Sequence, residues 1–350
     1  MASEDDREIR WADPTSAAAG AAPLAAAQVA AWREAGFVLV DGVLPQALLE
    51  RARADAEAIF PAPGSPEADA TRDFGSDGRM TFPSASDAVN AITLHPRLLA
   101  AVAQLLGVPV MELRLTQSDL WPKYGHPRSG AERDNADQRI HVDYPNHTLV
   151  HPPRWDRPEA VEIILYLSDV SETGGATAVV PRRGADDPAY PWPITRTPGV
   201  GALEYHNDRE SAEAYLERED PEAARFRRTH LYPREVRARF GFGSLLLYRH
   251  DTWHRGTPLR PGARRIAHNL TFRSAASEWI STLHAGWAWG MYRPGLPVER
   301  LLAAASVEQR CVLGFPAPGH PYWTPETVAA VEARYGPQGM DVAPYRVGLP

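Results

Sequence analysis

The chain has 350 residues, a formal net charge of −7 and a single cysteine, Cys311. The acidic balance argues against a nucleic-acid binder, which usually presents a basic face. One cysteine excludes an intrachain disulfide framework and fits a reducing compartment. The start lacks the basic and apolar regions of a secretory signal, and no stretch reaches the roughly 20 apolar residues of a membrane span. We therefore expect a cytoplasmic protein with no nucleic-acid or membrane partner, while its oligomeric state is not indicated.

The front part of the chain is mostly helical by pattern. Residues 1–23 are polar and then Ala-rich, so we expect a flexible N-terminus. Helices are predicted after this segment from amphipathic spacing, from a proline at the start of one helix and from glycines at the ends of others. The predicted helices cover residues 24–34, 45–60 and 96–107, with a strand at 37–44.

Short β-like runs follow, separated by loops rich in Gly, Pro and polar residues. These runs lie within residues 110–121, 139–144, 160–170, 172–184, 240–258 and 264–273. Helices in the N-terminal part of the sequence, followed by short strands, predict a mainly β fold with flanking helices. We expect its core to be a double-stranded β-helix (the jelly roll of cupin-like proteins). We place this domain at 24–284, with a polar insert at 185–235 that carries a helix around 209–228. A C-terminal extension, 285–350, is expected to pack on the same domain.

The stretch RIHVDY, residues 139–144, carries the first chemical signal. His141 and Asp143 are two apart in a strand-like run, so their side chains would point the same way. Such a pair is weak evidence by itself, but a second histidine, His254, follows the apolar run GSLLLY later in the chain. Two histidines and one carboxylate on neighbouring strands cover one face of an octahedral ion and leave three positions free. Non-haem Fe(II) oxygenases use this arrangement.

Two arginines, Arg264 and Arg265, open the strand-like run that follows His254. A guanidinium can take a carboxylate in a two-pronged hydrogen bond. A co-substrate with a carboxylate at each end could therefore chelate iron with one end and contact an arginine with the other. Strand alternation puts Arg265 on a face of small and polar residues and Arg264 on a bulkier face. A loop shorter by one residue would reverse this choice.

Several segments together resemble the phytanoyl-CoA dioxygenase-like family of Fe(II)/2-oxoglutarate-dependent oxygenases, which includes ectoine hydroxylase-like enzymes. Residues 28–55 resemble the family's N-terminal helix–strand–helix, and LYLSDVSETGGATAVVP (165–181) resembles its central strand and Gly turn. GSLLLYRHDTWHRGTP (243–258) resembles the segment around its second histidine, and IHVDY resembles its His-x-Asp strand. The resemblance leaves the insert and the C-terminal extension uncovered.

The resemblance implies roles for individual residues. His141, Asp143 and His254 would be the iron ligands and the catalytic centre. The arginine that holds the far carboxylate of 2-oxoglutarate usually follows the second histidine by eleven positions, which selects Arg265.

Two further residues match co-substrate positions of the family. Gln117, on the strand before His-x-Asp, resembles a glutamine that touches 2-oxoglutarate in some members. Thr257 would hydrogen-bond the same molecule. Without a role in co-substrate binding, Gln117 would be a solvent-facing glutamine on a strand, and Thr257 would belong to an ordinary turn.

Three other functions stay open. His250 and His254 are spaced i, i+4, which on a helix would suit a zinc hydrolase, although the run before them is β-like and no Glu stands between them. A halogenase would replace Asp143 by a small residue, so the presence of Asp143 favours hydroxylation. A non-catalytic ligand-binding jelly roll would be expected to lose a metal ligand or the arginine, and none is missing.

We therefore expect a dioxygenase that uses Fe(II), 2-oxoglutarate and O2. It would hydroxylate or otherwise oxidise an unactivated C–H bond of a small-molecule substrate, with release of succinate and CO2. No basic cluster for coenzyme A is evident, which favours a free small molecule, for instance of natural-product metabolism.

Overall fold

A computed structural model describes residues 22–71, 79–82, 84–126, 137–277, 296–307, 310 and 315–349. The expected flexible start falls almost entirely outside these residues, as does Cys311.

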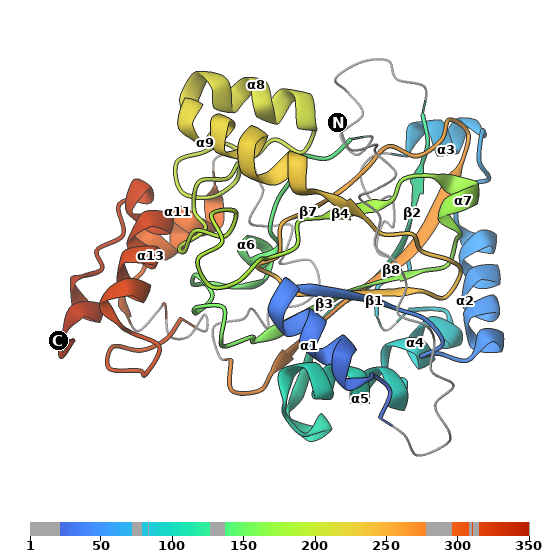
Figure 1. Cartoon of the computed structure of the whole chain (residues 1–350), viewed down its shortest axis with the longest axis horizontal. Helices are drawn as coiled ribbons and strands as arrows, with labels where there is room; N and C mark the ends of the chain where they lie inside the picture. Colours follow the sequence, from blue (N-terminus) through green and yellow to red (C-terminus); the bar gives the residue numbers. More distant parts are fainter. Residues whose placement is uncertain are drawn as a thin grey trace.

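The β core consists of two antiparallel sheets (Figure 1). The larger sheet has the strand order β1 (Phe37–Val40), β6 (Leu245–Tyr248), β3 (Ala160–Tyr166), β8 (Arg264–Ser274) and β2 (Leu113–Tyr124). The smaller sheet has the order β5 (Val236–Arg237), β4 (Thr177–Val179) and β7 (His254–Gly256). In the larger sheet no two neighbouring strands are consecutive in the chain, as in a jelly roll, whereas in the smaller sheet β4 pairs with the consecutive β5 as well as with β7. The predicted mainly β fold is confirmed.

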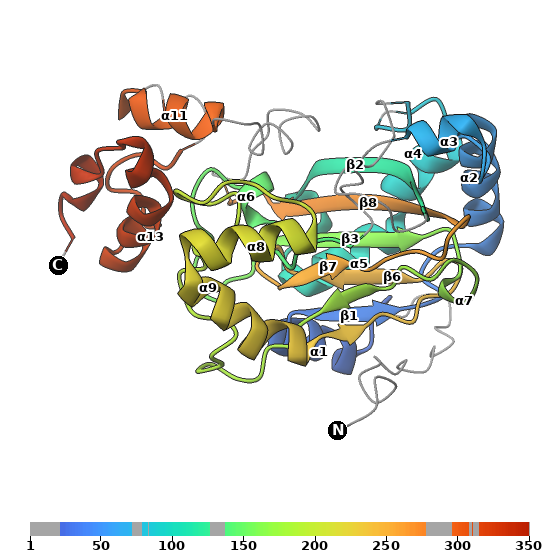
Figure 2. The same ribbon diagram turned by 90° about the horizontal axis from the view of Figure 1, so that it is seen from above.

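The N-terminal helices form a layer on the outer face of the larger sheet (Figure 2). They are α1 (Ala26–Ala35), α2 (Gln46–Ile59), α4 (Asp87–Thr93) and α5 (Pro96–Leu106), with the short α3 (Pro66–Ala70) after α2. Alternation along β3 divides the core, because neighbouring side chains of a strand point to opposite faces. Ile163 and Leu165 pack on the helix layer, whereas Ile164 and Tyr166 belong to the interior between the sheets.

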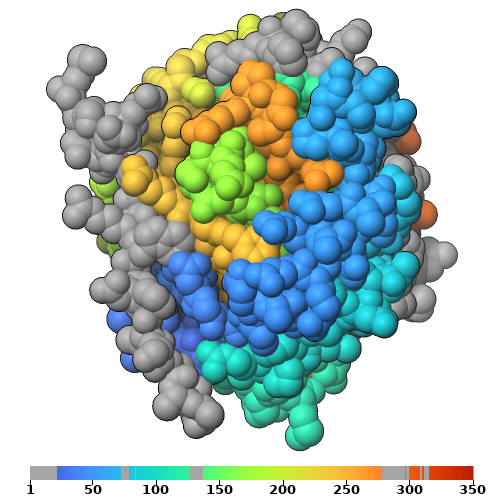
Figure 3. Space-filling view, turned by 90° about the vertical axis from the view of Figure 1, so that its right-hand side faces the viewer, coloured from blue at the N-terminus to red at the C-terminus, as the bar shows by residue number. Residues whose placement is uncertain are grey.

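The remaining helical segments are short. They are η2 (Val110–Glu112), α6 (Tyr144–His147), α7 (Val170–Thr173), α8 (Arg209–Glu219), α9 (Pro221–Phe226), η3 (Arg227–Leu231), η4 (Tyr232–Arg234), α11 (Pro297–Ala304), α13 (Pro325–Tyr335), η5 (Gly336–Gln338) and η6 (Ala343–Arg346). In the space-filling view, α2 and α3 (blue) lie beside α7 (light green) and close this end of the molecule (Figure 3).

One helical stretch, Asp87–Leu106, is long and apolar enough by length and composition to cross a membrane. By that measure the expectation that no stretch would qualify is wrong. The stretch is divided, since α4 ends at Thr93 and α5 begins at Pro96. Apolar side chains of both helices, including Ile92 and Val102, are buried in the core under the larger sheet.

The predicted helix around 209–228 is instead two helices, α8 and α9. Asp220 ends α8 and caps α9, because its side chain accepts a hydrogen bond from the backbone N–H of Ala223. Pro221 then occupies the first turn, where its missing N–H has no cost. An Asp-Pro pair in the middle of a helical pattern therefore starts a new helix.

The C-terminal extension forms its own apolar cluster with the segment that follows α6. Phe315, Trp323 and Tyr335 pack there with Leu149 and Val150. Figures 1 and 2 show α11 and α13 at the end of the molecule opposite α2 and α3.

Candidate metal centre and cavity

His141, Asp143 and His254 converge, and one potential ligand atom from each lies within 4.8 Å of the others. Nε2 of His254 is 3.2 Å from Oδ2 of Asp143, and Nε2 of His141 is 3.5 Å from Oδ1. Two imidazole nitrogens and the carboxylate of Asp143 therefore face one another. This donor set suits a divalent transition metal.

Backbone carbonyls orient both imidazoles. Nδ1 of His141 lies 2.9 Å from the carbonyl oxygen of Arg139, and Nδ1 of His254 lies 3.0 Å from that of Thr252. A carbonyl only accepts, so Nδ1–H donates to it and Nε2 is the atom directed toward Asp143, where it could bind a metal ion. In the metal-free protein burial lowers the pKa of His254, but Asp143 outweighs this and raises it above the usual value. Metal-binding histidines are commonly fixed in this way.

Asp143 is buried, and its environment keeps it ionised. Burial alone would raise its pKa, but the adjacent His254 and His141 imidazoles hold the pKa below the usual range. The hydroxyl of Tyr248 on β6 also donates a hydrogen bond to Oδ2, at 2.7 Å. Burial lowers the pKa of His141 well below its usual range, so this imidazole is neutral near pH 7. An anionic carboxylate and a neutral imidazole are the protonation states that a metal ion needs.

The path of residues 139–144 differs from the predicted strand. His141 forms an isolated antiparallel bridge with His254, and the backbone turns helical at Asp143, with φ −92° and ψ −15°. Both backbone N–H groups of Asp143 and Tyr144 donate to the carbonyl of His250, which lies in the turn between β6 and β7. The two ligands converge through this turn rather than by strand alternation.

The structure contradicts the zinc-hydrolase interpretation, which requires His250 and His254 to lie on one helix. His250 follows β6 in a turn and His254 begins β7, so no helix joins them. His250 is buried and is absent from the group of side chains that could hold an ion together.

The three side chains line a cavity between the sheets. The other lining residues are Gln117, Trp121, Gln138, Arg139, Asn146, His147, Ile164, Thr177, Tyr205, Tyr248, Gly256, Arg265 and Asn269. Arg265 is buried, and its Nη1 donates to the carbonyl of Gly175 in the Gly turn before β4. Arg264 lies on the opposite face of β8, where Nη1 donates to the carbonyl of Pro61 at 2.9 Å. The predicted face of Arg265 is therefore the cavity face.

The two other predicted co-substrate residues lie differently. Gln117 is buried in the cavity wall and accepts a hydrogen bond from Thr271 at 3.2 Å. The hydroxyl of Thr257 donates to the carbonyl of Ala176 at 2.7 Å, and Thr257 is not one of the lining residues. The structure thus brings Gln117, but not the hydroxyl of Thr257, to the cavity.

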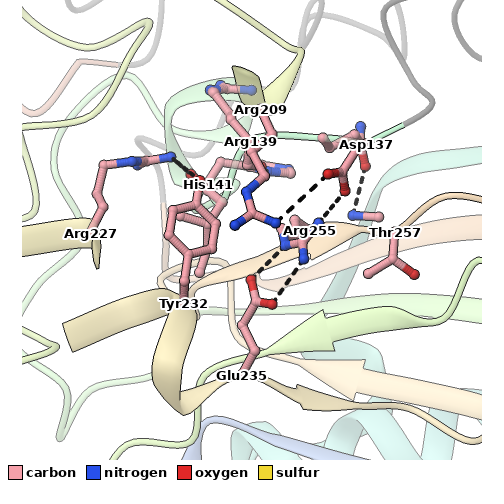
Figure 4. Close-up of polar contacts among 12 residues, drawn as sticks. Asp137, Arg139, His141, Arg209, Arg227, Tyr232, Glu235, Arg255 and Thr257 are labelled. Carbon is pink, nitrogen blue, oxygen red and sulfur yellow. Dashed lines mark hydrogen bonds and ion pairs between the residues drawn. The ribbon is translucent and has the colours of Figure 1, made fainter. Parts of the chain in front are cut away.

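The insert contacts residues that adjoin both histidines of the metal centre. From η3, Arg227 donates to the carbonyl of Ile140, at 3.0 Å, beside His141. Arg255, next to His254, lies between the carboxylates of Glu235 and Asp137 (Figure 4). Sequence reasoning missed these contacts, since each joins segments that are far apart along the chain.

Sequence reasoning also missed most of the cavity wall. Tyr205 comes from the insert, and the guanidinium of Arg139 lies 4.6 Å from the centre of its ring. Tyr248 was detectable, because it stands on the strand that leads to His254. Arg139 was detectable too, since it shares a strand-like run with His141. Tyr205 carries no such signal.

Comparison with known families identifies the family of this chain. The profile of the phytanoyl-CoA dioxygenase (PhyH) family matches residues 32–267. The chain belongs to the phytanoyl-CoA dioxygenase family. This family is Fe(II)- and 2-oxoglutarate-dependent and uses O2, so the chain is an oxidoreductase. No curated protein matches the chain at a significant level.

The solved structure of EctD shows the same fold as this phytanoyl-CoA dioxygenase family member, and other solved structures are similar to it. EctD from S. alaskensis, in its apo form, is 15% identical, with a TM-score of 0.50 over 83% of this chain and 86% of that chain. The carbocyclase SnoK from nogalamycin biosynthesis is 18% identical, with a TM-score of 0.48 over 85% and 94%. The epimerase SnoN, solved with Fe3+, α-ketoglutarate and nogalamycin RO, is 17% identical, with a TM-score of 0.49 over 84% and 95%.

Proposed function

We propose that this protein is an Fe(II)/2-oxoglutarate-dependent dioxygenase that oxidises an unactivated C–H bond of a free small molecule. The main support for this proposal is that His141, Asp143 and His254 converge on the wall of a cavity that Arg265 also lines. A metal centre and a buried guanidinium in one cavity suit a co-substrate that has a chelating 2-oxo acid at one end and a carboxylate at the other.

The residues of this chain fit that cofactor set. Iron with 2-oxoglutarate and O2 would supply the oxidising chemistry and release succinate and CO2. His141 and His254 would offer Nε2, while Asp143 would offer a carboxylate oxygen kept anionic by its surroundings. Arg265 would hold the far carboxylate, and Gln117 lies in the same wall. The buried setting of all these groups would exclude bulk water from the reacting atoms.

The substrate side of the cavity is formed partly by the insert. Tyr205 and the adjacent Arg139 supply an aromatic face and a cation there, and Arg139 also donates to the carbonyl of Pro198 at 3.3 Å. Such a wall suits a small molecule with both apolar and polar groups. We propose hydroxylation as the reaction and natural-product metabolism as its setting.

The metal assignment predicts the behaviour of His141→Ala and Asp143→Ala. Each variant should keep the wild-type circular dichroism spectrum but lose Fe(II) affinity and succinate formation by at least about tenfold, because an open triad has no spare ligand. His230→Ala, which alters a histidine in η3 of the insert, is the matched control and should behave as wild type.

The measurements are anaerobic Fe(II) and 2-oxoglutarate titrations, followed by succinate release on addition of O2 with or without candidate substrates. Wild-type protein that binds neither Fe(II) nor 2-oxoglutarate would contradict the proposed function. Succinate release at the wild-type rate by either ligand variant would contradict the assignment of the ligands.

A further inference from the structure

One charged side chain of the cavity wall has no ligand in the site described so far. Among the described residues that line the cavity, Asp143, Arg265 and Arg139 carry a full charge. Asp143 belongs to the metal centre, and Arg265 belongs to the proposed co-substrate site. Arg139 lies on the substrate side and is only 2% exposed. Taking a guanidinium so far out of water is costly, and a bound anion is one way to offset that cost.

The insert holds Arg139 through neutral groups. Its Nη2 donates to the carbonyl of Pro198 at 3.3 Å, and its guanidinium carbon lies 4.6 Å from the centre of the Tyr205 ring. A carbonyl dipole and an aromatic ring stabilise a cation but carry no net charge. These two contacts therefore orient the guanidinium at the cavity wall without cancelling its charge.

Arg139 lies near enough to the metal centre for its charge to act on both histidine ligands. Burial lowers the pKa of His141 most, and the charges of His254 and Arg139 act in the same direction. Burial also acts to lower the pKa of His254, with a smaller contribution from Arg139, although Asp143 raises this pKa overall. An anion bound to Arg139 would therefore lie beside the metal ion.

The charges of the loaded cavity balance except at Arg139. Histidines bind a metal ion in the neutral form, and burial lowers the pKa of His147, another lining residue, to about 4. In the proposed complex, Fe(II) and Arg265 together offset Asp143 and the two carboxylates of 2-oxoglutarate. The lining residues then add one further charge, that of Arg139. In a site that excludes water, a singly charged anion would offset this excess.

We propose that the substrate is a small carboxylic acid whose carboxylate binds Arg139. This inference rests on the proposed function and names the chemical class of its substrate. A carboxylate supplies one negative charge and matches the planar guanidinium in a charge-assisted hydrogen bond. A coenzyme A ester would instead bring several phosphate charges to a wall that offers one cation. The ring of Tyr205, which also lines the cavity, would contact the carbon skeleton beside the carboxylate.

The first test uses acetate and acetamide, which have nearly the same shape but differ in charge. Acetate is small enough to enter any site that accepts a carboxylate. The protein is loaded with paramagnetic Co(II) and saturated with 2-oxoglutarate, and the 13C relaxation of each probe is measured. In wild type the carboxyl carbon of acetate should be relaxed at least about tenfold more strongly than the carbonyl carbon of acetamide, because only acetate makes the charge-assisted contact.

Variants of Arg139 test the assignment to this residue. Arg139→Gln should remove the difference between the probes, whereas Arg139→Lys should keep part of it, because lysine retains the charge but not the planar fork. Arg182→Gln alters an arginine that stacks on Trp155 and is not one of the lining residues, so it is the matched control and should behave as wild type.

Two outcomes would overturn the proposal. One is equal relaxation of the two probes in wild type, and the other is relaxation of acetate that persists in Arg139→Gln. Failure of wild type to bind 2-oxoglutarate at all would instead overturn the proposed function.

A second measurement needs wild-type protein alone, so it remains decisive if Arg139→Gln does not fold. The visible absorption bands of the Co(II) complex report the atoms bound to the metal ion. Acetate that is strongly relaxed but leaves these bands unchanged lies beside the metal ion, as expected for a carboxylate on Arg139. Acetate that alters the bands occupies the metal ion itself, which would overturn the proposal.

Discussion

The adjacent arginines Arg264 and Arg265 show how one step along a strand separates two environments. Arg264 lies near the end of α2, where its Nη2 is 3.6 Å from Glu57 and Nη1 donates to backbone carbonyls. Arg265 points into the cavity and has no carboxylate among the groups that shift its pKa, which burial lowers. Strand alternation along β8 turns the two side chains to opposite faces of the sheet, and this decides which partners each one meets.

At the residue scale we predict different effects of Arg265→Ala and Arg264→Ala. Arg265→Ala should weaken 2-oxoglutarate binding by about a hundredfold, because a two-pronged charge-assisted contact is lost. Arg264→Ala is the matched control and should change the affinity by less than about threefold, since exposed or partly exposed pairs contribute little. Anaerobic titration with 2-oxoglutarate measures both. A larger effect at Arg264 would show that the strand register is off by one residue.

At the scale of elements, the turn between β6 and β7 is fixed from outside the sheet. Arg249 donates its backbone N–H to the carbonyl of Gly36, and the hydroxyl of Thr252 donates to the same oxygen at 2.9 Å. Gly36 ends α1 with φ 95°, and a Cβ there would lie 2.6 Å from that hydroxyl oxygen. Only glycine permits both this backbone conformation and this close approach. The end of α1 therefore helps to position the turn that leads into His254.

The insert is joined to β7 by an ion-pair cluster that we expect to stabilise it. Arg255 is buried, and Nη2 lies 3.0 Å from Oε2 of Glu235. Arg255→Met should lower the free energy of unfolding by about 3 kcal/mol, because it leaves a buried carboxylate without its partner. It should also speed hydrogen exchange of residues 209–235. Arg218→Ala, at an exposed pair with Glu219, should cost less than about 1 kcal/mol. Urea unfolding and hydrogen exchange measure these effects, and equal stabilities of the two variants would contradict the expectation.

At the scale of the whole molecule, the C-terminal extension reaches the metal centre indirectly. Arg334 in α13 is 1% exposed, and its two terminal nitrogens donate to the carbonyls of Thr148 and Pro145, at 2.8 and 3.0 Å. Tyr322 donates to the carbonyl of His151 at 2.6 Å. These contacts hold the segment that begins immediately after Asp143.

We therefore predict that Arg334→Leu affects both stability and metal binding. It should lower the free energy of unfolding by about 2–3 kcal/mol, because two buried carbonyls lose a charged donor. The loosened segment should also weaken Fe(II) binding about tenfold, as for other residues that support metal ligands. Arg346→Ala removes an exposed pair with Glu332 and should change neither quantity appreciably. Thermal unfolding and Fe(II) titration decide this, and an unchanged Fe(II) affinity in Arg334→Leu would mean that the extension only stabilises the fold.

Local sequence patterns were enough to predict the class of fold, several of the helices and the metal-binding candidates. Amphipathic periodicity and glycine stops act over one or two turns of chain, so α2 and α5 could be predicted close to their observed bounds. The two-residue spacing of His141 and Asp143 and the apolar run before His254 are equally local. Alternation along β8 likewise indicated the face of Arg265, which the structure places in the cavity.

Which distant residues meet depends on the packing of the folded chain. Cross-strand register put Lys123 opposite Arg265, and folding of the insert put Tyr205 against Arg139. The turn at Asp143 depends on hydrogen bonds to His250, more than a hundred residues away along the chain. Such contacts depend on how strands and loops pack together, and no period in the local sequence encodes that packing.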